Sequence, residues 1–282
     1  VLMIHTHLFL KTSLILVEKS MNKLGILGWP LAKTYSPQIH KFLLDLCGLE
    51  GSYHTIKYEI IDSKIVSRIN DDFSGYNVTI PHKEKIVSLN NSSILSESVK
   101  AIGACNTILN KNSKTYLFNT DFSGFKTFLD LIQYDFGINS VLILGSGGSS
   151  KAIAYCLKLM NVNYYIASRG ENIGTIPYSE ISKISKSIGL VINTTPLGMP
   201  PYQDTNFDID WQLFDNLETV INLGYGSENK FLDKFDKSIN QYDGLGMLVC
   251  QAIESFNIWT SADLSPIRIY GEVLQELEGI DD

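Results

Sequence analysis

The sequence is poor in the residues that build cross-links and metal centres. It has four cysteines in 282 residues. They lie far apart, and the sequence has no Cys-x-x-Cys pair and no Cys/His cluster at metal-ligand spacing. We therefore expect free thiols and no metal site. Free thiols are typical of a reducing compartment, so we expect a cytoplasmic protein.

The sequence also lacks long apolar runs and any excess of basic residues. No apolar run reaches the roughly 18–20 residues that cross a bilayer. Lys and Arg number 23 against 30 Asp and Glu, which gives a formal net charge of -7. Proteins that bind nucleic-acid phosphates usually carry a basic face. We expect neither a membrane protein nor a nucleic-acid-binding protein, although a local basic pocket for a small anion is compatible with this charge.

The length and composition favour two ordinary globular domains. At roughly 150 residues per domain, 282 residues predict two, and 44% hydrophobic residues can fill their cores. Residues 1–20 show neither a basic start nor a small-residue cleavage site, so we do not interpret them as a signal peptide. We expect them to be an extension outside the fold, which begins near Met21.

The first hundred residues of the expected fold have a mixed α/β pattern. A short apolar run at 23–27 predicts a buried strand, and Ser36-Pro37 carries the cap and first-turn residues of a helix. Residues 53–61 and 76–80 are predicted strands. Residues 107–109 and 115–118 flank a polar turn and predict a β-hairpin.

The second half reads as a βαβ series that ends in helices. A helix is predicted at 122–133, followed by a continuous apolar strand at 140–144 that is typical of a strand covered on both faces. After a helix that ends near residue 160, further strands are predicted at 164–167, 190–193 and 219–222. Helices are predicted at 246–260 and 266–277.

A glycine-rich turn, GSGGSS, lies between the predicted strand at 140–144 and the helix after it. Gly145 permits the tight turn, Gly147 lets a diphosphate approach the backbone, and Gly148 opens the helix. The pattern is a variant of G-x-G-x-x-G, with Ser150 in place of the last small residue. It predicts a dinucleotide site, and a plain strand-to-helix turn is the alternative.

The end of the next strand indicates which dinucleotide binds. A free ribose 2′-hydroxyl usually meets Asp or Glu there, whereas a 2′-phosphate needs a cation. This strand ends with Ser168 and Arg169, and Arg169 suits a 2′-phosphate. The sequence therefore predicts NADP rather than NAD, unless Arg169 is only a surface residue of a loop.

A lysine and a carboxylate outside the glycine-rich turn are candidates for proton transfer. Asn77 and Thr79 lie two apart on a predicted strand and so point to one face, and Lys83 follows them. Asp121 lies at the border between the two halves. Reduction of a carbonyl by hydride needs a proton donor at the oxygen, and a lysine oriented by a carboxylate can supply it. Position alone favours a solvated Lys83.

Seven segments, in order, resemble the shikimate dehydrogenase family from about Leu24 to about Gln275. The segments are GWPLAKTYSPQIH, GYNVTIPHKE, AIGACNTI, NTDFSG, LILGSGGSSKA, VINTTPLGM and YDGLGMLVCQA. The resemblance implies the NADPH-dependent reduction of 3-dehydroshikimate to shikimate in chorismate and aromatic amino-acid biosynthesis. It implies an α/β substrate domain at residues 21–120, which C-terminal helices at residues 245–282 complete. It also implies a Rossmann-type NADP-binding domain at residues 121–244.

Transferred residue by residue, the resemblance implies that Lys83 and Asp121 form the catalytic pair. Lys83 would give a proton to the ketone oxygen in reduction and take it back in oxidation. Asp121 would orient Lys83 and bind a substrate hydroxyl. The substrate-binding residues implied are Thr34, Ser36, Asn77, Thr79, Asn106, Tyr225 and Gln251.

The roles of Tyr225 and Gln251 have structural alternatives, because Tyr225 could simply pack and Gln251 could be an exposed helix residue. Thr34 replaces a family serine but keeps the hydroxyl that would hold the substrate carboxylate. The cofactor-binding residues implied are Gly145, Ser146, Gly147, Gly148, Ser149, Ser168, Arg169, Asn193, Thr194, Met199 and Gly244.

The sequence departs from the family pattern without losing a group that the chemistry needs. Lys33 stands where many relatives have His, and Phe122 follows Asp121 in place of Gly. Asn222 and Ser227 replace the usual Asp and Pro. The second strand ends in SRG instead of NRT and lacks a second basic residue, so the strictness of the NADP preference stays open.

Three alternative functions remain at this stage. The first is an NAD-using quinate/shikimate dehydrogenase, and the second is a non-catalytic NADP-binding regulator on the same fold. The third is an enzyme like methylenetetrahydrofolate dehydrogenase, although the polar set around Thr34, Asn77 and Asn106 suits a small polyol acid better than a folate. The expected partner is a small-molecule substrate, and a homodimer is kept as a hypothesis.

Overall fold

The computed structural model describes residues 22–31, 34–90, 92–170, 173–198, 202, 205, 207–226 and 230–278. The expected extension at 1–20 lies outside the described residues, as do Lys33, Met199 and Ser227. Among the helices in the described ranges, none is long and apolar enough to cross a membrane. All four cysteines lie within these ranges and are free thiols, as predicted.

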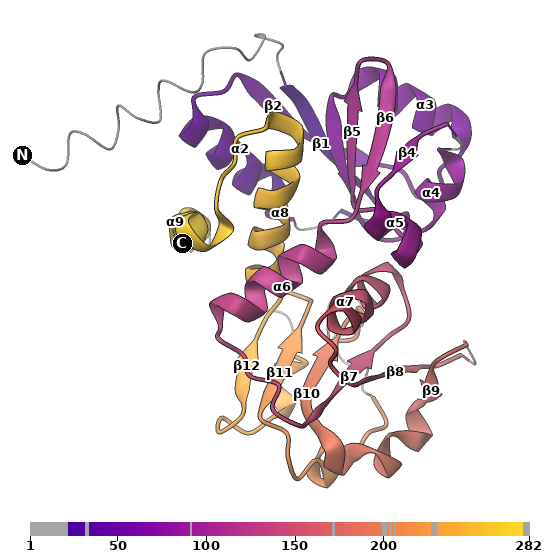
Figure 1. Ribbon diagram of the computed structural model, residues 1–282, viewed down its shortest axis with the longest axis vertical. Helices are drawn as coiled ribbons and strands as arrows, with labels where there is room; N and C mark the ends of the chain where they lie inside the picture. The colour runs from indigo at the N-terminus through magenta and orange to yellow at the C-terminus, as the bar shows by residue number, and fades with distance from the viewer. Residues whose placement is uncertain are drawn as a thin grey trace, which may run out of the picture.

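The first half of the chain builds a six-stranded sheet with the order β2-β1-β3-β5-β6-β4 (Figure 1). Strands β1, β2 and β3 run parallel, and β5 of the β5–β6 hairpin pairs antiparallel with β3. The elements of this half are β1 (Asn22–Gly28), α2 (Ser36–Cys47), β2 (Gly51–Lys57), α3 (Ser63–Asp72), β3 (Gly75–Val78), α4 (Lys85–Leu89), β4 (Ile94–Leu95), α5 (Glu97–Ile102), β5 (Thr107–Lys111) and β6 (Lys114–Phe118).

The second half builds a parallel six-stranded sheet with the order β12-β11-β10-β7-β8-β9. The chain starts at β7 near the centre and winds outward to both edges, which is the doubly wound arrangement of dinucleotide-binding folds. Its elements are α6 (Asp121–Leu131), β7 (Ser140–Leu144), α7 (Gly148–Leu159), β8 (Tyr164–Ser168), β9 (Ile176–Pro177), β10 (Ile188–Asn193), β11 (Thr219–Asn222) and β12 (Asn240–Tyr242).

Two C-terminal helices, α8 (Leu245–Thr260) and α9 (Pro266–Glu278), return to the first half of the chain. They form a buried cluster with α2, and the Trp259 indole donates a 2.8 Å hydrogen bond to the Ile108 carbonyl of β5. Figure 1 shows α8 rising from the second sheet to lie beside the first. The predicted two-part α/β architecture with returning helices is confirmed.

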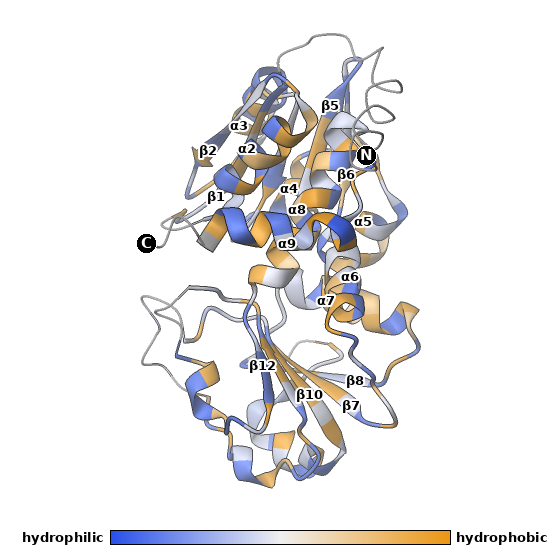
Figure 2. Cartoon of the chain, turned by 90° about the vertical axis from the view of Figure 1, so that its left-hand side faces the viewer, coloured by the Kyte–Doolittle hydropathy of each residue, from blue (hydrophilic) through white to orange (hydrophobic). Residues whose placement is uncertain are grey.

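Each sheet has its own core. Side chains of α3, α4 and α5 cover one face of the first sheet. In the second sheet, alternate residues of β7 point to opposite faces: Val141 packs with α6 and α7, and Leu142 packs with a cluster of aromatic residues beyond residue 206. Figure 2 shows the hydrophobic residues gathered along β7 and β10 in the middle of this sheet.

Two local predictions need correction, and one helix was not predicted. The strand predicted at 53–61 ends at Lys57. Helix α3 follows it and was not predicted from the sequence. The Asp62 carboxylate caps this helix by accepting a hydrogen bond from the Ile65 amide at 2.8 Å. Helix α2 begins at Ser36 rather than after it. Its cap is Tyr35, which caps through no side-chain hydrogen bond, and the Thr34 hydroxyl accepts from the Ser36 amide at 3.3 Å.

Candidate active site

Two cavities meet between the two sheets. The first has a volume of about 430 Å³ and is lined by the glycine-rich turn and the end of β8. The second, of about 530 Å³, is lined from β1 and β3 on one side and from α6 and α8 on the other. The residues that line both are Ile80, Lys83, Ser149, Thr194, Thr195 and Pro196.

The glycine-rich turn lies where the sequence predicted it, between β7 and α7. Gly145 has a φ of +108°, and a Cβ there would come within 2.6 Å of the Thr194 hydroxyl oxygen. A Cβ on Gly147 would meet no other atom within 4 Å, which leaves open space above this backbone. Helix α7 then begins at Gly148 and directs its free amides toward the first cavity. A cofactor diphosphate fits such a turn.

The far end of the first cavity carries a cation. Arg169 lines it beside Ser168 and Tyr178, and the Ser168 hydroxyl fixes the turn by donating to the Gly170 carbonyl at 2.8 Å. Burial raises the pKa of Tyr178, and the positive charge of Arg169 offsets part of that shift. The guanidinium is solvent-exposed, so it is free to meet an anionic group of a ligand in this cavity.

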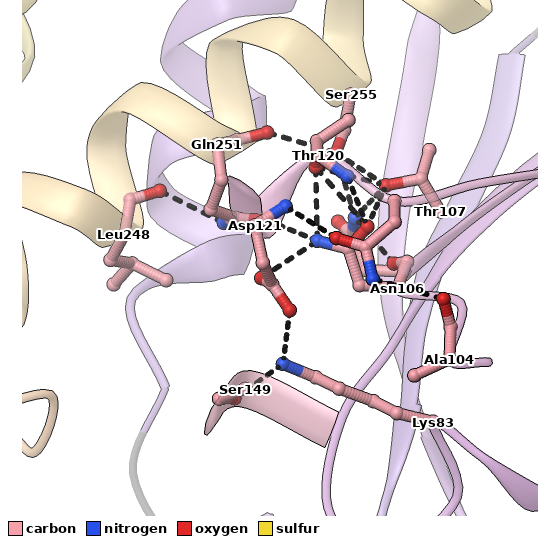
Figure 3. A network of polar contacts seen from close by, with 12 residues as sticks. Lys83, Ala104, Asn106, Thr107, Thr120, Asp121, Ser149, Leu248, Gln251 and Ser255 are labelled. Carbon is pink, nitrogen blue, oxygen red and sulfur yellow. Dashed lines mark hydrogen bonds and ion pairs between the residues drawn. The ribbon is translucent and has the colours of Figure 1, made fainter. Parts of the chain in front are cut away.

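Lys83 and Asp121 meet at the junction of the two cavities (Figure 3). The lysine Nζ lies 2.7 Å from Asp121 Oδ2, and the side chains are 14% and 6% exposed. Lys83 comes from the loop before α4, whereas Asp121 is the first residue of α6. A carboxylate in the first turn of a helix is stabilised by the helix dipole. The sequence named both residues, and the fold brings them together.

A buried polar network holds the Asp121 carboxylate in place. The Asn106 amide donates to Asp121 Oδ1 at 2.9 Å, to the Thr120 hydroxyl at 2.9 Å and to Gln251 Oε1 at 3.2 Å. The Gln251 amide in turn donates to the Leu248 carbonyl. Figure 3 shows these contacts linking α6, α8 and the first sheet. Gln251 is therefore buried against the site, and not an exposed helix residue.

Asn77 is part of the same network. Its amide donates to the Asn106 carbonyl, to the Thr107 hydroxyl and to the Ser255 hydroxyl at 3.0–3.3 Å, while its oxygen accepts from the Tyr53 phenol at 2.8 Å. Thr107, Ser255 and Tyr53 were not predicted from the sequence. Asn77 and Asn106 line the second cavity while bonding to its walls, and their contact with a substrate hydroxyl stays a prediction.

Hydroxyl groups occupy another part of the second cavity. Thr34, Ser36 and Tyr225 all line it, and the Thr34 hydroxyl donates to the Ser36 hydroxyl at 3.2 Å. Burial raises the pKa of Tyr225, and the adjacent Thr34 hydroxyl offsets part of the shift. Tyr225 therefore stays a neutral phenol that can donate a hydrogen bond. Thr79, predicted on the same face as Asn77, also lines this cavity.

The remaining predicted cofactor residues differ in position. Asn193 is fully buried behind the cavity wall, where its oxygen accepts from the Thr195 amide and hydroxyl. It thereby shapes the segment 194–196, which lines both cavities. Thr194 and Gly244 reach a cavity directly, and a Cβ on Gly244 would lie 2.0 Å from the Leu223 carbonyl oxygen. Direct contact of Asn193 with a cofactor stays a prediction.

The charged residues where the two cavities meet determine which chemistry the site can perform. Of the lining residues that the structure describes, Lys83 and Asp121 are the only charged ones in the second cavity. An ammonium held beside a diphosphate-binding turn can protonate a carbonyl oxygen while a hydride reaches the carbon. The fold and the site thus define the class of dinucleotide-dependent oxidoreductases.

Comparisons with known proteins identify the family. A family model described as shikimate dehydrogenase substrate binding domain matches residues 26–108. The shikimate dehydrogenase (NADP(+)) of Staphylococcus aureus strain JH9 is 32% identical, with 91% of this chain and 99% of that protein covered. The chain belongs to the shikimate dehydrogenase family, as its sequence motifs predicted.

Solved structures agree. The 1.5 Å crystal structure of shikimate dehydrogenase 1 from Peptoclostridium difficile is 32% identical and superposes with a TM-score of 0.78, over 91% of this chain and 99% of that one. A chorismate mutase/shikimate 5-dehydrogenase fusion protein from Clostridium acetobutylicum is 27% identical with a TM-score of 0.79, over 92% and 98%. The predicted fold class is therefore confirmed.

Proposed function

We propose that this chain catalyses the reversible NADPH-dependent reduction of 3-dehydroshikimate to shikimate, a step of chorismate and aromatic amino-acid biosynthesis. One observation carries the proposal: the 2.7 Å Lys83–Asp121 ion pair lies at the junction of a cofactor-type cavity and a second cavity that holds several hydroxyl and amide side chains. The name of the Staphylococcus aureus relative, which includes NADP(+), supports the same substrate and cofactor.

The proposed division of labour follows the two sheets. We assign substrate binding to residues 22–120 together with α8 and α9, whose side chains pack on α2 and β5. We assign cofactor binding to residues 121–244, which contain the parallel sheet and the glycine-rich turn. The reaction then takes place between them, where the two bodies can exclude water from the reacting atoms.

The first cavity fits a nicotinamide dinucleotide. The open backbone at Gly147 and the N-terminus of α7 would hold the diphosphate, and Arg169 would pair with a ribose 2′-phosphate. When bound, this cofactor supplies or accepts the hydride of the reaction. The protein must therefore provide the proton, the orientation of the substrate and a dry site.

Lys83 provides the proton. As an ammonium it donates to the ketone oxygen, so the oxygen becomes a hydroxyl and the lysine is left as a neutral amine. In the reverse direction the amine takes the hydroxyl proton. Asp121 accepts a hydrogen bond from Lys83 and holds its nitrogen at one place, and Asn106 fixes the other carboxylate oxygen.

The substrate carboxylate needs hydrogen-bond donors at a distance from Asp121. Thr34, Ser36 and Tyr225 supply three neutral hydroxyls in the second cavity, and neutral donors can hold a carboxylate with little disturbance of the Lys83–Asp121 pair. Thr79 and Gln251 also line this cavity and are the proposed partners of ring hydroxyls.

A spectrophotometric assay tests the proposed function. Purified protein is mixed with shikimate and NADP⁺ or NAD⁺, and reduced cofactor is followed near ~340 nm. We expect turnover with shikimate and NADP⁺ at a kcat/KM well above that with NAD⁺. Faster turnover of quinate with NAD⁺ would instead identify the catabolic alternative. NADP⁺ binding without oxidation of shikimate or quinate would identify the non-catalytic regulator.

We also propose that the protein works in the cytoplasm. Its four cysteines are free thiols, and Cys105, Cys156 and Cys250 are buried. Thiols of this kind suit a reducing compartment. Fractionation of cells that produce the protein, followed by detection with an antibody, tests this assignment.

A further inference from the structure

Ser149 contacts the catalytic lysine from the cofactor side. Lys83 Nζ donates to Asp121 Oδ2 at 2.7 Å and to the Ser149 hydroxyl oxygen at 3.1 Å (Figure 3). Ser149 is the second residue of α7, so it belongs to the glycine-rich turn rather than to the substrate half of the chain. It lines both cavities, as Lys83 does.

The approach of these two segments is close along the backbone as well. A Cβ on Gly148 would lie 3.1 Å from Lys83 Cβ and 3.4 Å from Ala104 Cβ, so the turn passes directly over the base of the lysine. Lys151, two residues after Ser149, pairs at 2.5 Å with Glu84, the residue after Lys83, and both side chains are partly exposed. The loop that carries Lys83 is therefore held against the start of α7.

Electrostatics make the Ser149 oxygen necessary at this place. The N-terminus of α7 is the positive end of the helix dipole, and an ammonium near it is disfavoured. The Ser149 oxygen accepts a hydrogen bond from the ammonium in the first turn of this helix.

The three protons of the ammonium are then divided. One N–H donates a hydrogen bond to Asp121 and another donates to Ser149, which leaves the third N–H. Asp121 lines only the second cavity, whereas Ser149 lines both. With two acceptors fixed in space, the direction of the third N–H is fixed too, and this N–H is the one that can reach a ketone oxygen.

We propose that Ser149 is a positioning residue for proton transfer: its hydroxyl holds the Lys83 ammonium at the cofactor turn, so that the remaining N–H points to the substrate oxygen. The inference rests on the proposed function, because the position of Lys83 matters only if it transfers a proton. It assigns to Ser149 a role beyond the cofactor contact expected from the sequence.

The test compares Ser149→Ala, which removes the acceptor, with Ser149→Thr, which keeps it. In Ser149→Ala we expect kcat to fall about tenfold, since misplaced catalytic groups cost rate rather than binding. The KM for shikimate and the Kd for NADP⁺ should change by less than about twofold. Ser149→Thr should recover most of the lost kcat.

A second measurement needs no turnover. In the protein without cofactor, an acetylating N-hydroxysuccinimide ester modifies lysines at rates that mass spectrometry can follow peptide by peptide. We expect Lys83 to react more than about twofold faster in Ser149→Ala, because one acceptor fewer holds its nitrogen. Ser149→Thr should react at the wild-type rate.

Lys151→Gln is the matched control, because it breaks the neighbouring contact between the same two segments and leaves Lys83 Nζ with both acceptors. We expect its kcat and its Lys83 acetylation rate to match wild type. Thermal unfolding of each variant checks that the fold is intact.

Wild-type kcat in Ser149→Ala, or a weaker Kd for NADP⁺ with unchanged kcat, would overturn the positioning role. If the wild-type protein itself oxidised no shikimate, the proposed function would fail instead. The acetylation rates would then still show whether Ser149 holds Lys83.

Discussion

Each oxygen of the Asp121 carboxylate has its own donor. Lys83 Nζ meets Oδ2 at 2.7 Å and the Asn106 amide meets Oδ1 at 2.9 Å. Charge-assisted hydrogen bonds of this kind are roughly twice as strong as neutral ones. The carboxylate is therefore fixed in rotation as well as in position. Because Lys83 Nζ donates to this carboxylate, the lysine nitrogen is held in place too.

Arg169 is the residue that we propose selects the cofactor. It is exposed at the end of the first cavity, where the ribose 2′-substituent of the cofactor would lie. A 2′-phosphate would form an ion pair with its guanidinium, whereas a free 2′-hydroxyl would not. Arg169→Ala should raise the Kd for NADP⁺ by roughly 10–100-fold and leave the Kd for NAD⁺ within about twofold, since a hydrogen-bonded charge contributes roughly 1.5–3 kcal/mol.

Titration of protein fluorescence with each cofactor measures both constants. Arg68→Ala is the matched control, because Arg68 is an exposed arginine of α3 that lines neither cavity. Equal losses of NADP⁺ and NAD⁺ binding in Arg169→Ala would refute recognition of the 2′-phosphate.

His40 should make the folded protein sensitive to acid. Burial lowers its pKa from 6.5 to about 3, and the neighbouring Asn77 offsets only part of this shift. Between pH 6.5 and about pH 3, His40 is protonated in the unfolded chain but stays neutral in the folded chain. The free energy of unfolding therefore falls as the pH falls from 6.5 to about 3, by up to about 1.4 kcal/mol per pH unit.

His40→Phe removes this titration and keeps a ring against Tyr53, whose centroid lies 4.4 Å from that of His40. Between about pH 7.5 and about pH 5, urea unfolding should show the wild type losing about 2 kcal/mol more than the variant. Parallel pH profiles for the two proteins would contradict the assignment, whatever their difference at neutral pH.

The sequence named the residues with distinctive chemistry but could not place all of their partners. Lys83, Asp121 and the glycines occur in motifs whose order along the chain is informative. Tyr53 and Ser255 were missed because a tyrosine in a strand and a serine in a helix carry no signal of their own. Ser255 reaches Asn77 across 178 positions only because α8 packs on the first sheet.

Helices α6 and α8 cross closely, and this crossing builds the site. A Cβ on Gly124 would lie 2.6 Å from the Gln251 Cβ, so only glycine allows the two helices this near. The same crossing brings Asp121 of α6 and Gln251 of α8 to one side chain, that of Asn106. The two halves of the molecule are thus joined at the site through these two helices.

The turn before α7 offers a prediction from two glycine positions that are two residues apart. Gly145→Ala is strained by the φ of +108° and by the Thr194 hydroxyl at 2.6 Å, so it should cost about 1–3 kcal/mol of stability. Gly147→Ala has open space and an ordinary φ of -82°, so its stability should stay within about 0.5 kcal/mol.

Both substitutions should raise the Kd for NADP⁺ by about tenfold or more, since the diphosphate must reach the backbone of this turn. Urea unfolding and fluorescence titration separate the two effects. Tight NADP⁺ binding in Gly147→Ala would mean that the diphosphate lies elsewhere.

Strands and helices with a clear hydrophobic pattern were predictable from the sequence. Short strands, and the helix whose start depends on a capping residue, were less predictable. Strands β7 and β11 have the predicted bounds, and the hairpin turns at Asn112 and Ser113, both with positive φ, as a short polar turn requires. Helix α3 was missed because only Val66 and Ile69 among its residues are buried, so its apolar stripe is short. The short edge strands β9 and β12 owe their existence to pairing with neighbours.

At the scale of the whole molecule, function depends on two separately packed bodies facing each other. Each sheet has a core of its own, and the first cavity is walled mainly by one body. The second cavity takes its walls from both, including residues of β1, β3, α6 and α8. Lys83 and Ser149 meet across this boundary, so the proposed proton donor contacts the proposed cofactor turn directly.

The central claim is that Lys83, held by Asp121, gives the proton for a reduction whose hydride comes from the neighbouring cavity. Lys83→Ala should lower kcat for shikimate oxidation with NADP⁺ by about 10²–10⁴-fold, the usual contribution of general acid–base catalysis. The Kd for NADP⁺ should stay within about twofold, because the lysine does not belong to the turn that holds the cofactor.

Lys85→Ala, an exposed lysine two residues further on, is the control and should keep wild-type turnover. The deciding measurement is kcat of Lys83→Ala with saturating shikimate and NADP⁺. The account predicts a loss of at least about a hundredfold with cofactor binding intact. Turnover near that of the wild type would contradict it.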